Sequence, residues 1–289
     1  MATISRSFSF HYGDEPTRVV RGRVRLPATA AGPLPWVLVL HGFKGFMDWG
    51  FFPLLAERLA QAGLAAVCFN SSGSGIGADL ESFSDPEAFR RGTLSRQLED
   101  VERVRSLARS GELGPLAAER AGLFGHSRGG GLALVHAAEA GDYRALVTWA
   151  ALDRFDRWDE PTKAEWRRAG KLSVVNARTG QVLPMGVEVL EDFERQRERL
   201  DVLAACRRLR APVLGLHGAL DEAVEVACLR RLEAALPPGG GSRTRILEGQ
   251  GHTFGAVHPL LAVTPALEQA LNETVAWFAR HLAAEGARP

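Results

Sequence analysis

Cysteine is scarce in this sequence. Only three occur in 289 residues, Cys68, Cys206 and Cys228, and they are scattered among apolar neighbours. A disulfide-stabilised secreted domain carries an even and dense set of cysteines, and a structural zinc site needs ligands paired at short spacing. We therefore predict that the three cysteines are reduced core residues of a cytoplasmic protein that binds no metal.

Long hydrophobic runs are absent as well. No stretch of about 18 apolar residues occurs, which is the length that a membrane-spanning helix requires. Residues 1–12 lack the basic region and the apolar core of a secretory signal. The sequence therefore predicts a soluble protein without a membrane partner.

An excess of charge of either sign is also missing. The chain has 35 Lys and Arg against 34 Asp and Glu, which gives a formal net charge of +1. Nucleic-acid-binding domains usually carry a clear basic excess, so we expect no nucleic acid as a partner. The apolar share of 46% and the length allow one large α/β domain or two small ones. The oligomeric state stays open, and a homodimer is one of the options.

Buried strands and helices alternate along the chain. Apolar runs without polar alternation are typical of strands covered on both faces. Such runs occur at residues 36–41, 64–69, 121–124, 145–151 and 212–217. A hairpin within residues 5–26 precedes them, residues 243–247 form a last strand, and a terminal helix begins at Thr264-Pro265. The pattern predicts an α/β fold with a doubly wound, mostly parallel sheet of about eight strands.

One interval, residues 153–206, interrupts this alternation. It is highly charged, and it has no buried-strand pattern beyond a small hairpin around the turn residues 176–180. A structureless loop of this length would be unusual inside a compact domain. We predict a lid or cap insertion here, in a core formed by residues 1–152 and 207–289. A surface subdomain that only stabilises the edge of the sheet is the alternative.

Residues 125–129 read Gly-His-Ser-Arg-Gly and match the pattern G-x-S-x-G. In this pattern a strand turns sharply into a helix and holds a serine at a strained apex, where the flanking residues must lack bulk. A compact apolar run precedes the motif, and Leu132, Leu134 and Val135 follow it as one face of a helix. The sequence therefore predicts Ser127 as a nucleophile.

A serine hydroxyl needs an imidazole to accept its proton and a carboxylate to orient that imidazole. Asp221 follows the apolar run at residues 212–217, and His252 lies in a glycine-rich loop after the last strand. The order serine, acid, histidine is that of doubly wound hydrolases, so we predict Ser127, Asp221 and His252 as a triad. Asp153, which follows another strand, is the reserve candidate for the acid.

Two backbone amides are predicted to stabilise the oxyanion of a tetrahedral intermediate. Arg128 follows the nucleophile and supplies one N–H by the geometry of the turn. Glycines on either side of Phe43, within residues 41–45, let the chain expose a second amide. In the insertion, Trp158 and Trp166 are candidates for an apolar substrate pocket.

Other motifs in the sequence have structural interpretations. His126, His217 and His258 are read as hydrogen-bonded framework residues. Residues 73–78 fit the dinucleotide pattern G-x-G-x-x-A, but that pattern requires a helix to begin at once, and acidic residues followed by Pro86 come next. We expect no cofactor.

The combined motifs resemble those of the α/β-hydrolase superfamily. The segments that carry the resemblance are residues 41–45 (His-Gly-Phe-Lys-Gly), 125–129 (Gly-His-Ser-Arg-Gly), 217–221 (His-Gly-Ala-Leu-Asp) and 251–252 (Gly-His). Within the superfamily, the sequence is similar to the dienelactone-hydrolase and prolyl-oligopeptidase-like branch, especially bacterial feruloyl (cinnamoyl) esterase-like serine hydrolases. The resemblance covers roughly residues 17–285, and the highly charged insertion departs from it.

The resemblance implies Ser127 as nucleophile, Asp221 as acid and His252 as base, with the amides of Phe43 and Arg128 as the oxyanion hole. We predict a serine hydrolase that cleaves small to medium carboxylic esters through an acyl-enzyme intermediate. A peptidase or amidase with the same triad is one alternative. A non-catalytic protein that binds a ligand on the same fold is the other.

Overall fold

The structure, a computed structural model, describes residues 1–29 and 32–283. Its strands are β1 (Thr3–Tyr12), β2 (Glu15–Pro27), β3 (Leu34–Leu40), β4 (Ala65–Asn70), β5 (Leu116–His126), β6 (Ala145–Trp149), β7 (Lys171–Val175), β8 (Val182–Gly186), β9 (Val213–Gly218) and β10 (Arg243–Leu247). Its helices are α1 (Phe52–Gln61), α2 (Pro86–Arg90), α3 (Leu94–Ser110), α4 (Arg128–Ala140), α5 (Glu160–Ala169), α6 (Val187–Arg195), α7 (Val202–Arg208), α8 (Ala227–Ala235) and α9 (Pro265–Leu282). Residues 284–289, the end of the predicted core, lie outside the described residues.

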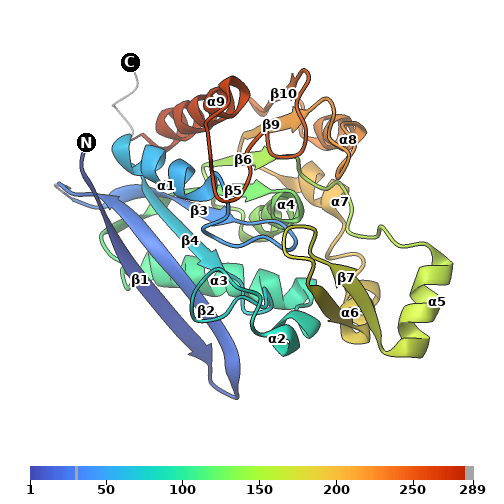
Figure 1. Cartoon of the computed structure of the whole chain (residues 1–289). Helices are drawn as coiled ribbons and strands as arrows, with labels where there is room; N and C mark the ends of the chain where they lie inside the picture. The colour runs from blue at the N-terminus through green and yellow to red at the C-terminus, as the bar shows by residue number, and fades with distance from the viewer. Residues whose placement is uncertain (30–31, 284–289) are drawn as a thin grey trace.

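The central sheet has eight strands in the order β1-β2-β4-β3-β5-β6-β9-β10 (Figure 1). β2 pairs antiparallel with both β1 and β4, whereas the pairs from β4 across to β10 are parallel. Parallel strands are covered on both faces, which explains their continuous apolar runs. The predicted doubly wound, mostly parallel sheet of about eight strands is therefore confirmed.

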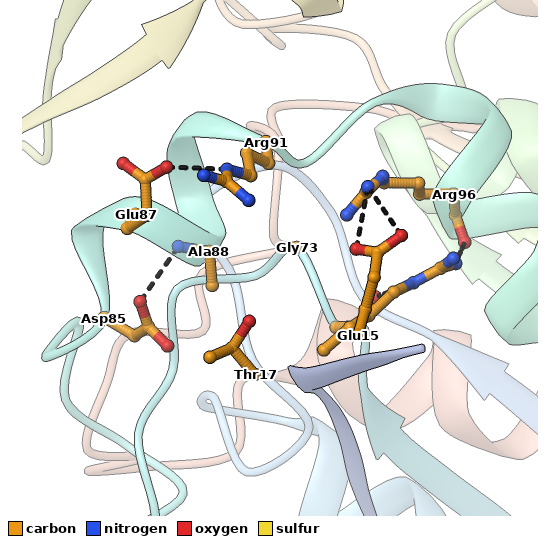
Figure 2. Close-up of a pocket in the computed structure, with 10 residues that line it drawn as sticks. Glu15, Thr17, Gly73, Asp85, Glu87, Ala88, Arg91 and Arg96 are labelled. Atoms are coloured by element: carbon orange, nitrogen blue, oxygen red, sulfur yellow. Dashed lines mark hydrogen bonds and ion pairs between the residues drawn. The ribbon is translucent and has the colours of Figure 1, made fainter. Parts of the chain in front are cut away.

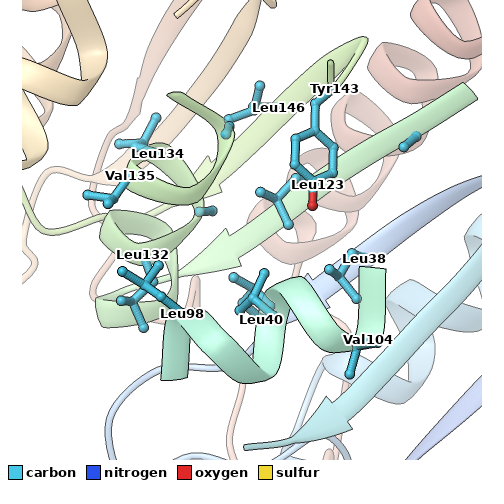
Figure 3. Packing of buried hydrophobic residues seen from close by; sticks show 14 of the residues in the cluster. Leu38, Leu40, Leu98, Val104, Leu123, Leu132, Leu134, Val135, Tyr143 and Leu146 are labelled. Atoms are coloured by element: carbon cyan, nitrogen blue, oxygen red, sulfur yellow. The ribbon is translucent and has the colours of Figure 1, made fainter. Parts of the chain in front are cut away.

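Side chains of the sheet alternate between two apolar cores, because successive residues of a strand point to opposite faces. In β3, Leu38 belongs to one core and Val37 to the other. Residues of α3, α4, α7 and α8 complete the first core, and residues of α1 and α9 complete the second. Figure 3 shows the first core, where Leu98 of α3 and Leu132 of α4 pack beside the sheet. The sheet is thus held between two helical layers.

Residues 153–206 form α5, the β7–β8 hairpin, α6 and most of α7, and α5 extends farthest from the sheet (Figure 1). The predicted hairpin around residues 176–180 is confirmed by the antiparallel pairing of β7 with β8. Trp166 of α5 and Leu190 of α6 pack with Phe46 and Phe89 in a third apolar cluster. The insertion therefore packs on the loop after β3, which contains Phe46, and on α2, which contains Phe89.

Polar contacts also join the insertion to the core. Lys44 Nζ donates a hydrogen bond to the Val175 carbonyl at 2.6 Å, and the Ser95 amide donates to Asp192 Oδ2 at 3.0 Å. Helix α7 crosses the predicted boundary at residue 206 and packs against α4. This boundary therefore falls inside a helix that belongs to the first core.

Two elements differ from the sequence expectation. β5 begins at Leu116, because Leu116 pairs with Leu34 at the start of β3. The apolar spacing does not predict α2, which has only five residues; Asp85 caps it by accepting a hydrogen bond from the Ala88 amide at 2.9 Å.

The cysteines are buried, as predicted. No helix in the described ranges is long and apolar enough to cross a membrane.

A buried carboxylate on α3 joins the edge of the sheet to the loop after β4. Asp100 accepts hydrogen bonds from the Tyr12 hydroxyl at 2.8 Å, the Ser72 amide at 2.7 Å and the Arg18 guanidinium at 3.1 Å. Tyr12 and Arg18 come from the first hairpin. Because Arg18 is also buried, this ion pair is shielded from water.

Replacement of Asp100 by Ala should lower the free energy of unfolding by about 3 kcal/mol, because the Tyr12 hydroxyl and the Ser72 amide lose their buried acceptor and Arg18 keeps only the half-exposed Glu99 as an ion-pair partner. Urea denaturation of the purified protein measures this loss. Asp14→Ala, at an exposed turn of the same hairpin, is the matched control and should change stability little. Equal losses in the two variants would contradict the structural role of Asp100.

Candidate active site

Ser127 lies at the sharp turn between β5 and α4. Its φ of 57° and ψ of −121° form a conformation that side-chain-bearing residues rarely adopt. A Cβ on Gly125 would lie 2.3 Å from the Gly129 carbonyl oxygen, and one on Gly129 would lie 2.5 Å from the His41 carbonyl oxygen. Both flanking positions therefore exclude a side chain, as the motif requires.

Asp221 and His252 are brought together from two loops at the carboxyl ends of β9 and β10. His252 Nδ1 donates a hydrogen bond to Asp221 Oδ2 at 2.8 Å. The amides of Ala223 and Val224 donate to Asp221 Oδ1, each at 2.9 Å. These contacts hold the imidazole in one orientation, with Nδ1 bound to Asp221 and Nε2 as the other ring nitrogen.

The carboxylate of Asp221 is fully buried, and His217 supports it from β9. His217 Nε2 donates to the Val224 carbonyl at 2.8 Å and lies 3.3 Å from Asp221 Oδ2. Burial alone would raise the pKa of Asp221, but hydrogen bonds from His217 and His252 bring it well below its usual range. Asp221 is therefore ionised wherever the protein is folded near neutral pH.

His126 ties the nucleophile turn to the loop of His252. Its Nε2 donates to the His252 carbonyl at 3.1 Å, and the two rings have centroids 4.7 Å apart. Burial lowers the pKa of His126 to about 3, so its ring is neutral. The structural interpretation of His126 and His217 is thereby confirmed.

The loop after β3 lies directly against Ser127. A Cβ on Gly42 would be 3.0 Å from Ser127 Cβ and 3.2 Å from the His126 carbonyl oxygen. Phe43, the next residue, shares the cavity with Ser127 and Arg128. Arg128 begins α4, and the first amides of a helix have no acceptor within it. The positions of both predicted oxyanion donors therefore adjoin Ser127.

Ser127 and His252 line one cavity of about 460 Å³. This volume is within the range of small-molecule sites. The other lining residues are Phe43, Lys44, Leu94, Arg128, Leu152, Phe155, Arg157, Trp158, Met185, Val189, Phe193, Ala223 and Val224. They come from the core and from residues 153–206, so the insertion forms part of the wall.

The two predicted pocket tryptophans have different positions. Trp158 lines the cavity. Trp166 is fully buried, and the centroid of its ring lies 5.1 Å from that of Trp158. Its indole N–H donates a hydrogen bond to the Met185 carbonyl at 2.9 Å. Trp166 therefore supports Trp158 and is not a wall residue, which corrects the prediction for Trp166. Its helix turns the ring into the third apolar cluster.

The reserve acid and the third histidine lie elsewhere. Asp153 forms an ion pair with Arg231. His258 accepts a hydrogen bond from the Gly50 amide at 3.0 Å and contacts Glu81 at 2.8 Å. Of the two candidate acids, Asp221 is the one that contacts His252.

A second cavity, of about 270 Å³, lies between the first hairpin, the loop after β4 and α2 (Figure 2). Gly73 lines it, and two of its three acidic residues form ion pairs, Glu15 with Arg96 and Glu87 with Arg91. The third, Asp85, accepts a hydrogen bond from the Ala88 amide. No helix begins within residues 73–78; the next one begins at Pro86. The dinucleotide motif thus lacks the adjoining helix N-terminus that would bind pyrophosphate. In the described ranges, no group of three His, Cys, Asp or Glu side chains is placed to hold a metal ion.

The sequence motifs miss most of the cavity wall. Lys44, Arg157 and Phe193 have no local pattern that distinguishes them from surface or core residues, since only the tertiary structure brings them to one cavity. His217 did have a signal in the sequence, because it ends the apolar run at residues 212–217, four residues before the predicted acid. That spacing places its ring 3.3 Å from Asp221 Oδ2.

No protein-family model matches the sequence, and no curated protein matches it either. Several solved structures are similar. A putative hydrolase from Agrobacterium vitis has a TM-score of 0.71 at 21% identity, over 96% of this chain and 100% of that one. Est1E from Butyrivibrio proteoclasticus, with ferulic acid bound, has a TM-score of 0.67 at 18% identity, over 92% and 96%. A dienelactone hydrolase from Anabaena variabilis has a TM-score of 0.63 at 20% identity, over 97% and 99%.

These likenesses establish the fold. The chain has the α/β-hydrolase fold, with a mostly parallel eight-stranded sheet between helical layers. The resemblance inferred from the four sequence segments is confirmed at this level.

Replacement of Gly125 by Ala should destabilise the protein, because the new methyl group would overlap a backbone carbonyl that cannot rotate away. Overpacking of this kind costs about 1–3 kcal/mol. Thermal or urea denaturation measures the change, and Gly13→Ala, where a Cβ meets no atom within 4 Å, is the matched control. Unchanged stability in Gly125→Ala would mean that the turn is looser than described.

Proposed function

We propose that this protein is a serine hydrolase that cleaves carboxylic esters of small to medium acyl substrates through an acyl-enzyme intermediate. One observation carries the proposal. Ser127 shares a cavity with His252, whose Nδ1 is bound to the buried carboxylate of Asp221 at 2.8 Å. A positioned imidazole beside a serine at a strained turn is the arrangement that activates a hydroxyl at neutral pH.

In the acylation step, Ser127 Oγ attacks the ester carbonyl carbon while His252 Nε2 accepts the hydroxyl proton. The ionised Asp221 stabilises the imidazolium that forms, and Asp221 itself stays deprotonated throughout. Nε2 then returns the proton to the alkoxide oxygen as the C–O bond of the ester breaks. The alcohol leaves, and the acyl group stays on Ser127.

The negative charge that develops on the carbonyl oxygen needs preorganised donors. The amides of Phe43 and Arg128 are the proposed pair, supported by the close approach of Gly42 to Ser127 Cβ. Each such donor contributes about 3–4 kcal/mol to transition-state stabilisation in serine hydrolases. In the second stage, water attacks the acyl-enzyme with His252 as base, and the acid is released.

Residues 153–206 serve as a lid over this reaction in the same proposal. Trp158, Met185, Val189 and Phe193 of this segment line the cavity and give it an apolar wall. The Lys44 hydrogen bond to Val175 joins the lid to the oxyanion loop. An apolar wall suits the carbon skeleton of an ester, and ferulic acid bound to the similar Est1E is one example of such a ligand.

The direct test is hydrolysis of a panel of p-nitrophenyl esters of increasing acyl length, with aminoacyl p-nitroanilides beside them. We expect ester cleavage that falls at least about a thousandfold in Ser127→Ala, because the nucleophile is lost. Circular dichroism of Ser127→Ala confirms that it is folded. Ester cleavage that survives in Ser127→Ala would contradict the proposal, and a preference for the anilides would identify a peptidase or amidase instead.

The assignment of the acid has its own test. Asp221→Asn should lower kcat by about 10⁴-fold, because the neutral amide no longer stabilises the imidazolium or selects its tautomer. Asp153→Asn is the matched control, since Asp153 pairs with Arg231 away from His252. Steady-state kinetics on one ester compare the two variants. Near-normal turnover in Asp221→Asn with a large loss in Asp153→Asn would transfer the role to Asp153.

A further inference from the structure

Arg128 has a side chain without an anionic partner at the centre of the proposed active site. It lines the cavity beside Ser127, and its Cζ lies 4.3 Å from the centre of the Phe43 ring. Within the described ranges, no carboxylate lies within ion-pair distance of its guanidinium. Other shielded arginines differ in this respect, since Arg18 pairs with Asp100 and Arg105 with Asp142.

Burial opposes the charge on Arg128. It lowers the pKa of this guanidinium from 12.5 to about 9, and no neighbouring anion compensates. The group is still protonated at neutral pH. The neighbouring His41 ring is neutral, because burial lowers its pKa to about 4 and the charge of Arg128 adds to that shift. A partly desolvated cation without a counterion is costly, so it indicates a group that an anion completes.

Two further cations line the same cavity. Lys44 Nζ donates to the Val175 carbonyl, and an Arg157 N–H donates to the Ala223 carbonyl at 2.8 Å. Both bind only neutral acceptors in the described part of the chain. No Asp or Glu lines the cavity among the described residues, since Asp221 lies behind His252. The cavity therefore combines a positive potential with an apolar wall.

We propose that the ester substrate carries a carboxylate, and that the Arg128 guanidinium binds this carboxylate while Ser127 attacks the ester carbonyl. This inference rests on the proposed serine hydrolase function and names its substrate class: monoesters of dicarboxylic acids and esters of comparable monoanionic molecules. The guanidinium lies over the Phe43 ring, and its planar set of N–H donors matches the geometry of a carboxylate, which it can bind through two parallel hydrogen bonds. The apolar wall contacts the carbon chain between the two groups.

The test compares two esters of similar length, p-nitrophenyl hydrogen glutarate, which is anionic, and p-nitrophenyl hexanoate, which is neutral. The readout is the ratio of their kcat/KM values within each variant, so that a general change in activity cancels. In the natural protein we expect the anionic ester to be favoured about tenfold to a hundredfold, the effect of one charge-assisted pair. The preference should weaken at high salt.

Three variants test whether Arg128 causes the preference for the anionic ester. Arg128→Gln should bring the ratio close to one, and Arg128→Lys should restore part of it because it keeps the charge. Arg207→Gln removes an exposed cation on α7 outside the cavity and should leave the ratio unchanged. Equal kcat/KM for the two esters in the natural protein would overturn the inference and leave the esterase proposal standing. A ratio that survives in Arg128→Gln would overturn the role of Arg128.

Binding separates this inference from the proposed function. If neither ester is cleaved, the serine hydrolase proposal fails, and calorimetric titration of the Ser127→Ala variant with both esters then decides. Tighter binding of the glutarate ester, lost when Arg128→Gln is added, would support the carboxylate site. Equal binding of both esters would overturn it.

Discussion

The Oδ2 atom of Asp221 accepts a hydrogen bond from His252 Nδ1 at 2.8 Å, and the proposed chemistry depends on this contact. The carboxylate is buried, yet it stays ionised because two backbone amides and two histidines surround it. A buried charge of this kind is stable only when its lone pairs are satisfied. The surrounding donors therefore also fix the orientation of the imidazole.

The fold delivers these groups to one edge of the sheet. In a parallel sheet the carboxyl ends of the strands lie on the same side, so the loops after β5, β9 and β10 meet there. The loop after β3, which contains Phe43, lies at the same edge. Apolar side chains of the insertion after β6 line the cavity, and Lys44, Arg128 and Arg157 give it positive charge. The core and the insertion therefore both contribute charged and apolar side chains to the cavity.

Much of this arrangement could be predicted from the sequence. Buried parallel strands have continuous apolar runs, and the glycines around Ser127 are required by backbone contacts that only a sharp turn produces. The order of Ser127, Asp221 and His252 along the chain predicts that Asp221 and His252 follow strands of the same sheet, and they follow β9 and β10. The apolar runs and the glycines are local features, and these can be recognised in a single sequence.

The parts that could not be predicted depend on contacts between distant segments. Trp166 was expected in the pocket wall, but the rotation of α5 directs it toward Met185 and leaves only Trp158 at the cavity. The unpaired state of Arg128 has no sequence signal, because it depends on which carboxylates the fold brings near. The short α2 also has no recognisable sequence pattern, since five residues are too few to show the spacing of apolar residues that marks a helix.

The most direct measurement is the intact mass of the folded protein after reaction with a fluorophosphonate, followed by peptide mapping. A nucleophilic serine activated by His252 should give one adduct per chain, on the peptide that contains Ser127, and none in Ser127→Ala. A folded protein that stays unmodified, or an adduct that persists in Ser127→Ala, would contradict the central claim that Ser127 is the activated nucleophile.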